Sequence, residues 1–124
     1  MPFDTEAFAT ALRKNALPPF GAGKCARFVR LAIEAAGMKT DPHPGSAKDW
    51  GPTLERLGFQ PVAGEGYEPV PGDIAVIQTT TESSDGHMQG YDGKNWISDF
   101  VQREFWPGPS FRKEKPAFVV FRFP

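Results

Sequence analysis

The clearest pattern in the chain is an apolar stripe that recurs every three or four residues between positions 25 and 36. This spacing predicts a helix that packs by one face. The stripe consists of Phe28, Val29, Ala32, Ile33 and Ala36. Gly37 follows it and suits the left-handed residue that ends many helices. A shorter helix is predicted over residues 46–57, where Ser46 and Asp49 have the spacing of a capping box, and Gly51 and Pro52 are expected to restart it.

The N-terminal part of the chain carries a second helical pattern. Asp4 is placed to cap a helix that runs to about position 15. Phe3 and Phe8 occupy the two positions of a hydrophobic staple at its start. Residues 17–23, rich in proline and glycine, then end regular structure and lead into the helix at position 25.

Beyond position 70 the apolar pattern changes from a helical period to short runs typical of strands. Strands are predicted at 74–77, 87–91, 95–101 and 117–123, with a turn at 92–94. Because helices come first and an antiparallel sheet follows, we expect an α+β fold. The length of 124 residues predicts one domain, residues 1–124.

Composition argues against several classes of function. The formal net charge is −1 and no run of lysine or arginine appears, which argues against nucleic-acid binding. No stretch of about 18 apolar residues occurs, which argues against membrane insertion. The N-terminal segment lacks the basic start and apolar centre of a secretory signal peptide. A site of action outside the cytoplasm would therefore require another route of export.

The single cysteine excludes an intramolecular disulfide and a cysteine-rich zinc site. The histidines and carboxylates show no spacing typical of metal ligands, and no complete phosphate-binding glycine loop is present. We therefore expect neither a metal nor a cofactor.

Cys25 is the first candidate for catalysis, because it stands in the first turn of the strongest predicted helix. Unpaired N–H groups and the positive end of the helix dipole favour the reactive thiolate there. Lys24 and Arg27 add positive charge. The N–H groups of this turn could also stabilise an oxyanion. The alternative is a small buried apolar residue.

A nucleophilic thiol needs a base within hydrogen-bond reach, and the chain has two histidines. His43 lies among prolines and a glycine, in a segment predicted to be an exposed loop. His87 opens a predicted strand, so we favour it as the base. The spacing alone leaves open whether His87 meets Cys25, and an ordinary histidine at a strand edge is the alternative.

A third residue should orient the imidazole of His87. Side chains alternate along paired strands, so a three-residue turn at 92–94 pairs His87 with Asp99, whereas a two-residue turn pairs it with Ser98. We favour Asp99, because a carboxylate stabilises imidazolium better than a hydroxyl does. Ser98 and Gln89 remain alternatives.

Two further residues admit more than one interpretation. Asp73 stands in a Pro-Gly-Asp turn, where an aspartate side chain caps neighbouring N–H groups, and we interpret it as structural. Trp96 could line a substrate groove, although most of the tryptophans are expected in the core.

Three sequence blocks together resemble the NlpC-type and CHAP peptidoglycan hydrolases. Residues 23–32 contain Cys-Ala, an aromatic residue and Val-Arg, as in the nucleophile helix of that group. Residues 70–77 resemble its Pro-Gly-Asp turn and following strand. Residues 86–100 resemble its Gly-His strand and the next strand with a third polar residue. The blocks occur in the family order and cover most of the chain.

The resemblance implies a papain-like fold in which Cys25 is the nucleophile, His87 the base and Asp99 the orienting residue. It implies hydrolysis of amide bonds in peptidoglycan peptides. Small members without a signal peptide are similar to amidase effectors that bacteria inject through a type VI secretion apparatus. Such a protein is made in the cytoplasm and acts in the periplasm of a target cell. The implied partners are a component of the secretion apparatus and an immunity protein.

The sequence departs from the family where Gly-His is followed by Met88, Gln89 and Gly90 rather than by small or β-branched apolar residues. We expect Gln89 to contact substrate, together with Lys24 and Trp96. The alternatives are a cysteine protease or acyltransferase acting on another amide or ester, and a catalytically silent binding module of the same fold.

Overall fold

The computed structural model describes residues 3–18, 21, 23–62 and 67–124. Its helices are α1 (Thr5–Asn15), α2 (Cys25–Ala35), the 3₁₀ turn η1 (Ala47–Asp49), α3 (Gly51–Arg56) and α4 (Pro109–Glu114). Its strands are β1 (Gln60–Val62), β2 (Ile74–Ile77), β3 (His87–Tyr91), β4 (Trp96–Ile97) and β5 (Phe118–Arg122). Positions 19, 20 and 22 of the predicted loop lie outside the described residues.

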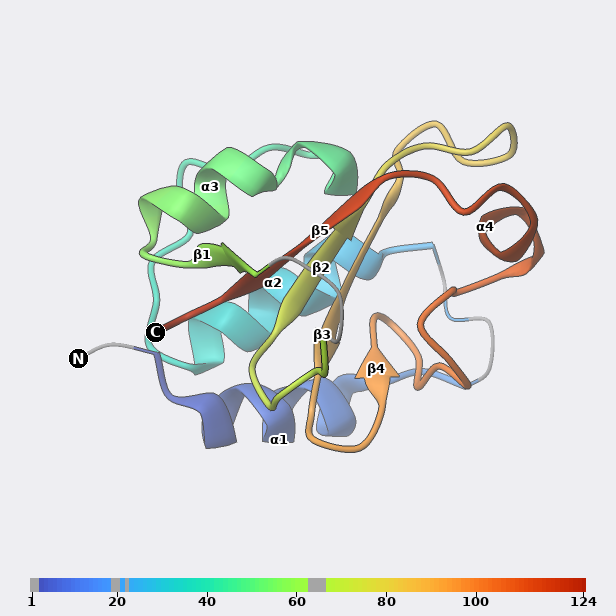
Figure 1. Ribbon diagram of the computed structural model, residues 1–124. Coiled ribbons are helices and arrows are strands. Elements are labelled where there is room, and N and C mark those ends of the chain that lie inside the picture. The colour runs from blue at the N-terminus through green and yellow to red at the C-terminus, as the bar shows by residue number, and fades with distance from the viewer. Residues whose placement is uncertain (1–2, 19–20, 22, 63–66) are drawn as a thin grey trace.

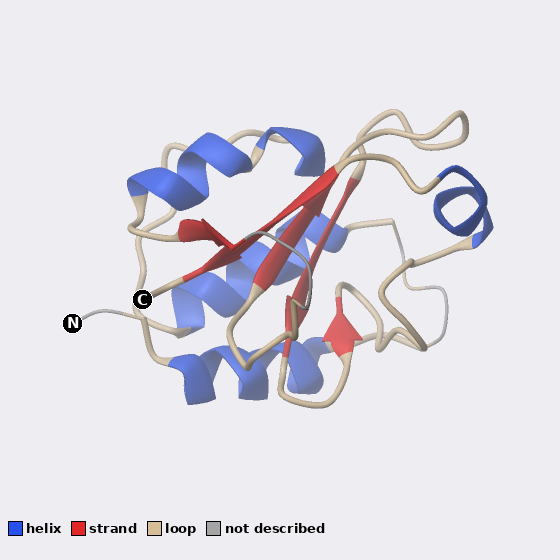
Figure 2. Cartoon of the chain, viewed as in Figure 1, coloured by secondary structure: helices blue, strands red, loops and turns tan. Residues whose placement is uncertain are grey.

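The described strands form one antiparallel sheet in the order β1-β5-β2-β3-β4 (Figure 2). The helices α1, α2 and α3 precede most of the sheet and gather around it (Figure 1). The predicted α+β class is therefore confirmed. The sequence pattern missed β1, which is three residues long, and α4, which begins with proline after a glycine.

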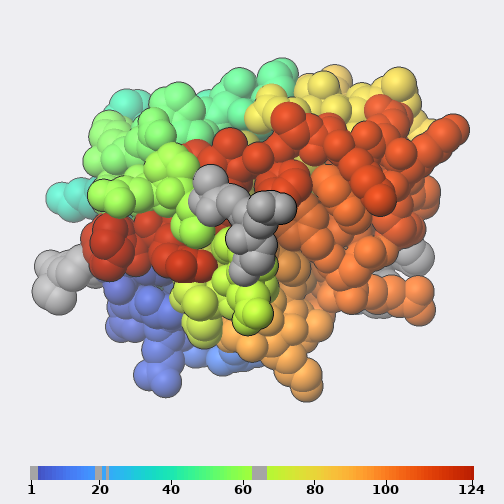
Figure 3. Space-filling view, in the orientation of Figure 1, coloured from blue at the N-terminus to red at the C-terminus, as the bar shows by residue number. Residues whose placement is uncertain are grey.

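The sheet separates two apolar clusters. Helices and strands build the larger cluster, whose fully buried members include Phe8, Leu12, Ile33, Leu54 and Met88. The smaller cluster is formed by strand residues that alternate with those of the larger one and so point to the opposite face. It contains Ala75, Trp96 and Val120, with Phe105 packed against them. Figure 3 shows the C-terminal segment in red beside the orange segment that supplies Phe105. Both faces of the central strands are thus covered.

The predicted start of α1 is confirmed. The side chain of Asp4 accepts a hydrogen bond from the Ala7 N–H at 3.0 Å, which satisfies one of the unpaired donors of the first turn. The rings of Phe3 and Phe8 lie with their centroids 5.1 Å apart, as a hydrophobic staple requires. Phe8 also lies against Gly90 of β3, where any Cβ would come within 2.5 Å of the phenylalanine ring. Glycine at this position therefore allows α1 to pack closely on the sheet.

The segment predicted as helical over residues 46–57 consists of η1 and α3, which meet at Trp50, and the predicted restart at Gly51 and Pro52 is confirmed. The predicted capping box is wrong. The Ser46 hydroxyl donates to the Asp85 carboxylate at 2.7 Å instead of capping its own helix. The helix begins again at Gly51, with Pro52 in its first turn, where a missing N–H costs nothing.

The predicted strand over residues 95–101 is shortened to Trp96 and Ile97, and its register differs from both expectations. Tyr91 pairs with Trp96, and Gly90 pairs with Ile97. Neither a two-residue nor a three-residue turn gives this pairing, so the argument that placed Asp99 directly opposite His87 is wrong.

The cause of the changed register lies in the side chain of Asp92. Its Oδ1 accepts hydrogen bonds from the N–H of Lys94 at 2.9 Å and from that of Asn95 at 2.7 Å. An aspartate that binds the backbone two and three residues ahead stabilises a wider loop. After β4 the chain turns back at once, and Ile97 forms a bridge with Val101.

Within the described part of the chain, no helix is both long and apolar enough to cross a membrane. The same residues contain no group of three or more histidine, cysteine or acidic side chains arranged to hold a metal ion.

Candidate active site

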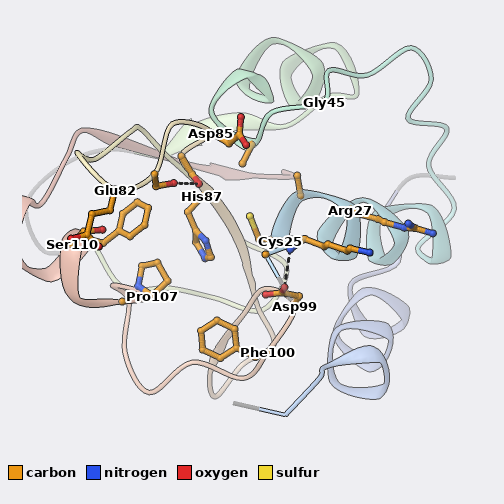
Figure 4. Close-up of a pocket in the computed structure, with 18 residues that line it drawn as sticks. Cys25, Arg27, Gly45, Glu82, Asp85, His87, Asp99, Phe100, Pro107 and Ser110 are labelled. Atoms are coloured by element: carbon orange, nitrogen blue, oxygen red, sulfur yellow. Dashed lines mark hydrogen bonds between the residues drawn. The ribbon is translucent and has the colours of Figure 1, made fainter. Parts of the chain in front are cut away.

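A pocket of about 530 Å³ opens where the N-terminus of α2 faces the start of β3. Four parts of the chain line it: residues 23–27, the pair Gly45 and Ala47, residues 82–83 and 85–87, and a C-terminal stretch that includes Asp99, Phe100 and Phe111. Figure 4 shows the side chains of Cys25 and His87 pointing into this shared space from opposite sides. The structure therefore brings together the two residues that the sequence proposed as nucleophile and base.

Cys25 is the first residue of α2 and is partly buried against the larger apolar cluster. Burial, together with a smaller effect of the negative charge of Asp99, raises the pKa of its thiol to about 11. Hydrogen bonds with the backbone of Met88, Ala26 and Cys25 itself act in the opposite direction but are weaker. The sequence argument that the helix N-terminus leaves a thiolate at rest is therefore wrong, because desolvation outweighs the backbone N–H groups.

His87 is 7% exposed, and its ring packs against Phe111 with the centroids 5.7 Å apart. Burial lowers the pKa of the imidazole to about 4. The hydrogen bond that the ring makes with Gln102, the charge of Asp99 and a hydrogen bond with Gln89 raise it by less. At neutral pH the site therefore holds a neutral thiol and a neutral imidazole. The neutral imidazole can accept a proton.

Asp99 lies at the pocket, although not through the strand pairing that suggested it. Its Oδ2 accepts a hydrogen bond from the backbone N–H of Lys24 at 2.9 Å, immediately before the nucleophile helix. A Cβ on Gly21 would lie 2.5 Å from the carboxylate carbon, so glycine with its φ of +58° lets the loop approach this closely. Asp99 thus ties the loop before Cys25 to the segment after β4. Its role in orienting His87 stays a prediction.

A residue that the sequence analysis missed lies beside His87. The Oε1 of Gln102 is 2.8 Å from the Nε2 of His87, and Gln102 is 2% exposed. The tight turn after β4 returns Gln102 to the site, and its N–H binds the Trp96 carbonyl at 2.9 Å. A straight strand to position 101 would have left Gln102 beyond the site, so no local pattern could reveal it.

The three residues expected to contact substrate have different positions. Lys24 is exposed and lines the pocket. Gln89 has no exposed surface, and Trp96 belongs to the smaller apolar cluster with 7% exposure. The prediction of direct substrate contact is therefore wrong for Gln89 and Trp96 in this structure, because both side chains are enclosed by the segment that carries Phe105.

Asp73 is confirmed as structural. Its carboxylate is fully buried and accepts hydrogen bonds from the Tyr67 hydroxyl at 2.7 Å and the Val70 N–H at 3.0 Å. It also binds the guanidinium of Arg122 at 2.9 Å. These contacts join the turn before β2 to β5, and Asp73 does not line the pocket.

Solved structures that resemble the whole chain support the effector interpretation. A crystal structure of the type VI native effector–immunity complex Tae3–Tai3 from Ralstonia pickettii contains a chain with 40% sequence identity and a TM-score of 0.90. The match covers 98% of this chain and all of the other. The chain belongs to the Tae3 effector family. The selenomethionine form of that complex gives 42% identity over 92% of this chain and 97% of the other, with a TM-score of 0.84.

The Tae3 match extends over nearly the whole chain, so the segments that carry Cys25, His87 and Asp99 belong to the shared fold. No model of a protein family matches the sequence, and no curated protein matches it. The broader prediction of a type VI effector is confirmed by the Tae3 match. The narrower resemblance to the NlpC-type and CHAP hydrolases stays a prediction.

Proposed function

We propose that this Tae3-family effector is a papain-like cysteine hydrolase that cleaves amide bonds in peptidoglycan peptides. The observation that carries the proposal is the shared pocket of Cys25 and His87. A thiol and an imidazole at one opening are the parts that nucleophilic acyl transfer needs. The relation to a type VI effector favours a bacterial cell wall as the target.

The proposed reaction starts from the neutral pair. The sulfur of Cys25 attacks the amide carbonyl while its proton passes to His87, because the raised pKa of the thiol and the lowered pKa of the imidazole disfavour an ion pair at rest. The backbone N–H of Cys25 donates to the developing oxyanion. The imidazolium then protonates the leaving amine, and a water molecule activated by His87 releases the acyl group.

Charges around the pocket are consistent with a peptide that carries both carboxylates and amines. Arg27 lies on one side of Cys25, and Glu82 and Asp85 lie on the other side (Figure 4), while Lys24, next to Cys25 in the chain, also lines the pocket. In this proposal the basic pair binds carboxylates of the wall peptide, and the acidic pair binds its ammonium groups. The opposite charges would then set the direction in which the peptide crosses the thiol.

Delivery and protection complete the proposal. The similar structures are effector–immunity complexes, so we infer that an immunity protein protects the producing cell. We also infer that a component of the type VI apparatus carries the chain from the cytoplasm to the periplasm of a target bacterium.

The neutral resting thiol is also what a catalytically silent module of this fold would show, so the proposal requires a functional test. We expect expression with a periplasmic export signal to lyse a Gram-negative host, and expression without that signal to leave growth unchanged. Cys25→Ala and His87→Gln should abolish lysis at equal protein levels, with His43→Gln as the matched control. Equal lysis by wild type and Cys25→Ala would reject the cysteine hydrolase.

A further inference from the structure

Two buried glutamines form a connected pair behind His87. Gln102 and Gln89 are 2% and 0% exposed, and the Nε2 of Gln102 donates to the Oε1 of Gln89 at 2.9 Å. Polar side chains enclosed this completely persist only where their hydrogen bonds are satisfied. The hydrogen-bond partners of this pair determine which way each amide faces.

Backbone carbonyls fix the orientation of Gln102. Its Nε2 also lies 3.1 Å from the carbonyl oxygen of Glu104 and 3.2 Å from that of Phe105. A carbonyl oxygen only accepts, so the atom that faces two of them must be the NH₂ group. Rotating the amide by half a turn would set its oxygen against both carbonyls and leave them without this donor.

The same carbonyl of Phe105 fixes Gln89. The Nε2 of Gln89 donates to it at 2.9 Å, so the Oε1 of Gln89 faces the NH₂ group of Gln102. Gln89 therefore holds Gln102 in its orientation, although it has no surface in the pocket. This contact explains the polar residue at a strand position where an apolar residue would otherwise pack.

We propose that Gln102, held by Gln89, is a positioning residue that keeps the hydrogen of neutral His87 on Nε2 and leaves Nδ1 as the base. The oxygen of Gln102 faces Nε2 at 2.8 Å and can only accept, so the ring must donate there. With the hydrogen on Nε2, Nδ1 carries the lone pair and is the nitrogen that would take the proton of Cys25. The role in catalysis rests on the proposed hydrolase function, whereas the tautomer itself does not.

An amide suits this position because it orients the ring without adding a charge. Among the described residues, the charge that acts on His87 is that of Asp99, Cys25 shares the pocket with it, and Phe111 packs against the ring. Lys24, Arg27, Glu82 and Asp85 also line the pocket. A second carboxylate in place of Gln102 would favour imidazolium at rest. The glutamine pair instead preserves the neutral imidazole that accepts the thiol proton.

The first test reads the tautomer in the resting protein without substrate. Long-range ¹H–¹⁵N spectra of labelled wild type at pH 7 should show His87 protonated at Nε2 only, with its signals assigned by comparison with His43→Gln. A spectrum with the proton on Nδ1, or with both tautomers in exchange, would overturn the proposal. Gln102→Met should convert the His87 signals to a mixture of tautomers, and an unchanged single tautomer in that variant would also overturn it.

The second test measures hydrolysis of soluble muropeptides. Gln102→Met should lower kcat by at least about tenfold with KM unchanged, because correct placement of a general base contributes a large factor to the rate. Gln89→Met should lower kcat less, and it serves as the test if Gln102→Met does not fold. Gln60→Met, at an exposed glutamine of β1, is the matched control and should keep the wild-type kcat.

The two tests distinguish the positioning role of Gln102 from the enzyme activity itself. Wild type that shows the Nε2 tautomer but no hydrolysis would reject the proposed function and leave the tautomer assignment standing. Folded Gln102→Met with the wild-type kcat would reject the positioning role, even where the wild-type enzyme is active.

Discussion

The buried, neutral imidazole of His87 should make the fold sensitive to mild acid. Burial lowers its pKa from 6.5 to about 4 in the folded protein. Between these two values the unfolded chain binds a proton that the folded chain excludes, so the free energy of unfolding falls as the pH falls. Each pH unit of this window costs about 1.4 kcal/mol, and the whole window costs about 3 kcal/mol. Above about pH 6.5 the contribution is constant, because His87 is neutral in both states.

Urea unfolding measured at intervals from pH 7.5 to 4 tests this prediction, with His87→Gln as the partner protein. The difference in unfolding free energy between wild type and variant should shrink by about 3 kcal/mol across the window. Glu34 and Asp92, whose pKa values are lowered, contribute to the free energy of unfolding, and this contribution is lost at lower pH in both proteins. His43→Gln should keep the His87 contribution. A difference that does not change with pH would refute the buried neutral histidine.

Two further perturbations test the thiol and the loop before it. At pH 7.5 iodoacetamide should alkylate Cys25 about a hundredfold more slowly than a free cysteine, because a pKa of about 11 instead of 9 leaves about a hundredfold less thiolate; alkylation as fast as the free thiol would contradict the desolvated neutral state. Gly21→Ala should lower hydrolysis at least about tenfold by displacing Asp99, since positioning errors of this size reduce rates strongly. Gly23 has a similar positive φ of +71°, and a Cβ added there would meet open space. Gly23→Ala should therefore lower stability with a smaller loss of rate. Equal losses of rate in both variants would count against the Asp99 contact.

Local patterns in the sequence predicted the elements that carry the two reactive side chains. The apolar stripe of α2 and the glycine-rich loop before it placed Cys25 in a first helical turn, and the structure agrees. The short strand that begins at His87 was also predicted correctly. These features depend on neighbouring residues only, which is why the sequence reveals them.

The rest of the site depends on contacts that no local pattern encodes. The wider loop at Asp92 changed the strand register by its own side-chain hydrogen bonds, and the turn after β4 brought Gln102 beside His87. The thiol pKa depended on how deeply the larger cluster encloses Cys25, and the helix terminus alone gave the wrong sign. Register and burial are both tertiary properties, so sequence reasoning identified the residues but not their chemical state.

The most direct test of the central claim is digestion of purified peptidoglycan by wild type and by Cys25→Ala, with the soluble fragments analysed by mass spectrometry. We predict new muropeptides from wild type that carry one added water at a cleaved amide bond, and none from folded Cys25→Ala. The mass of each fragment would also identify the bond. An untouched wall with folded wild type, or the same fragments from both proteins, would contradict the account.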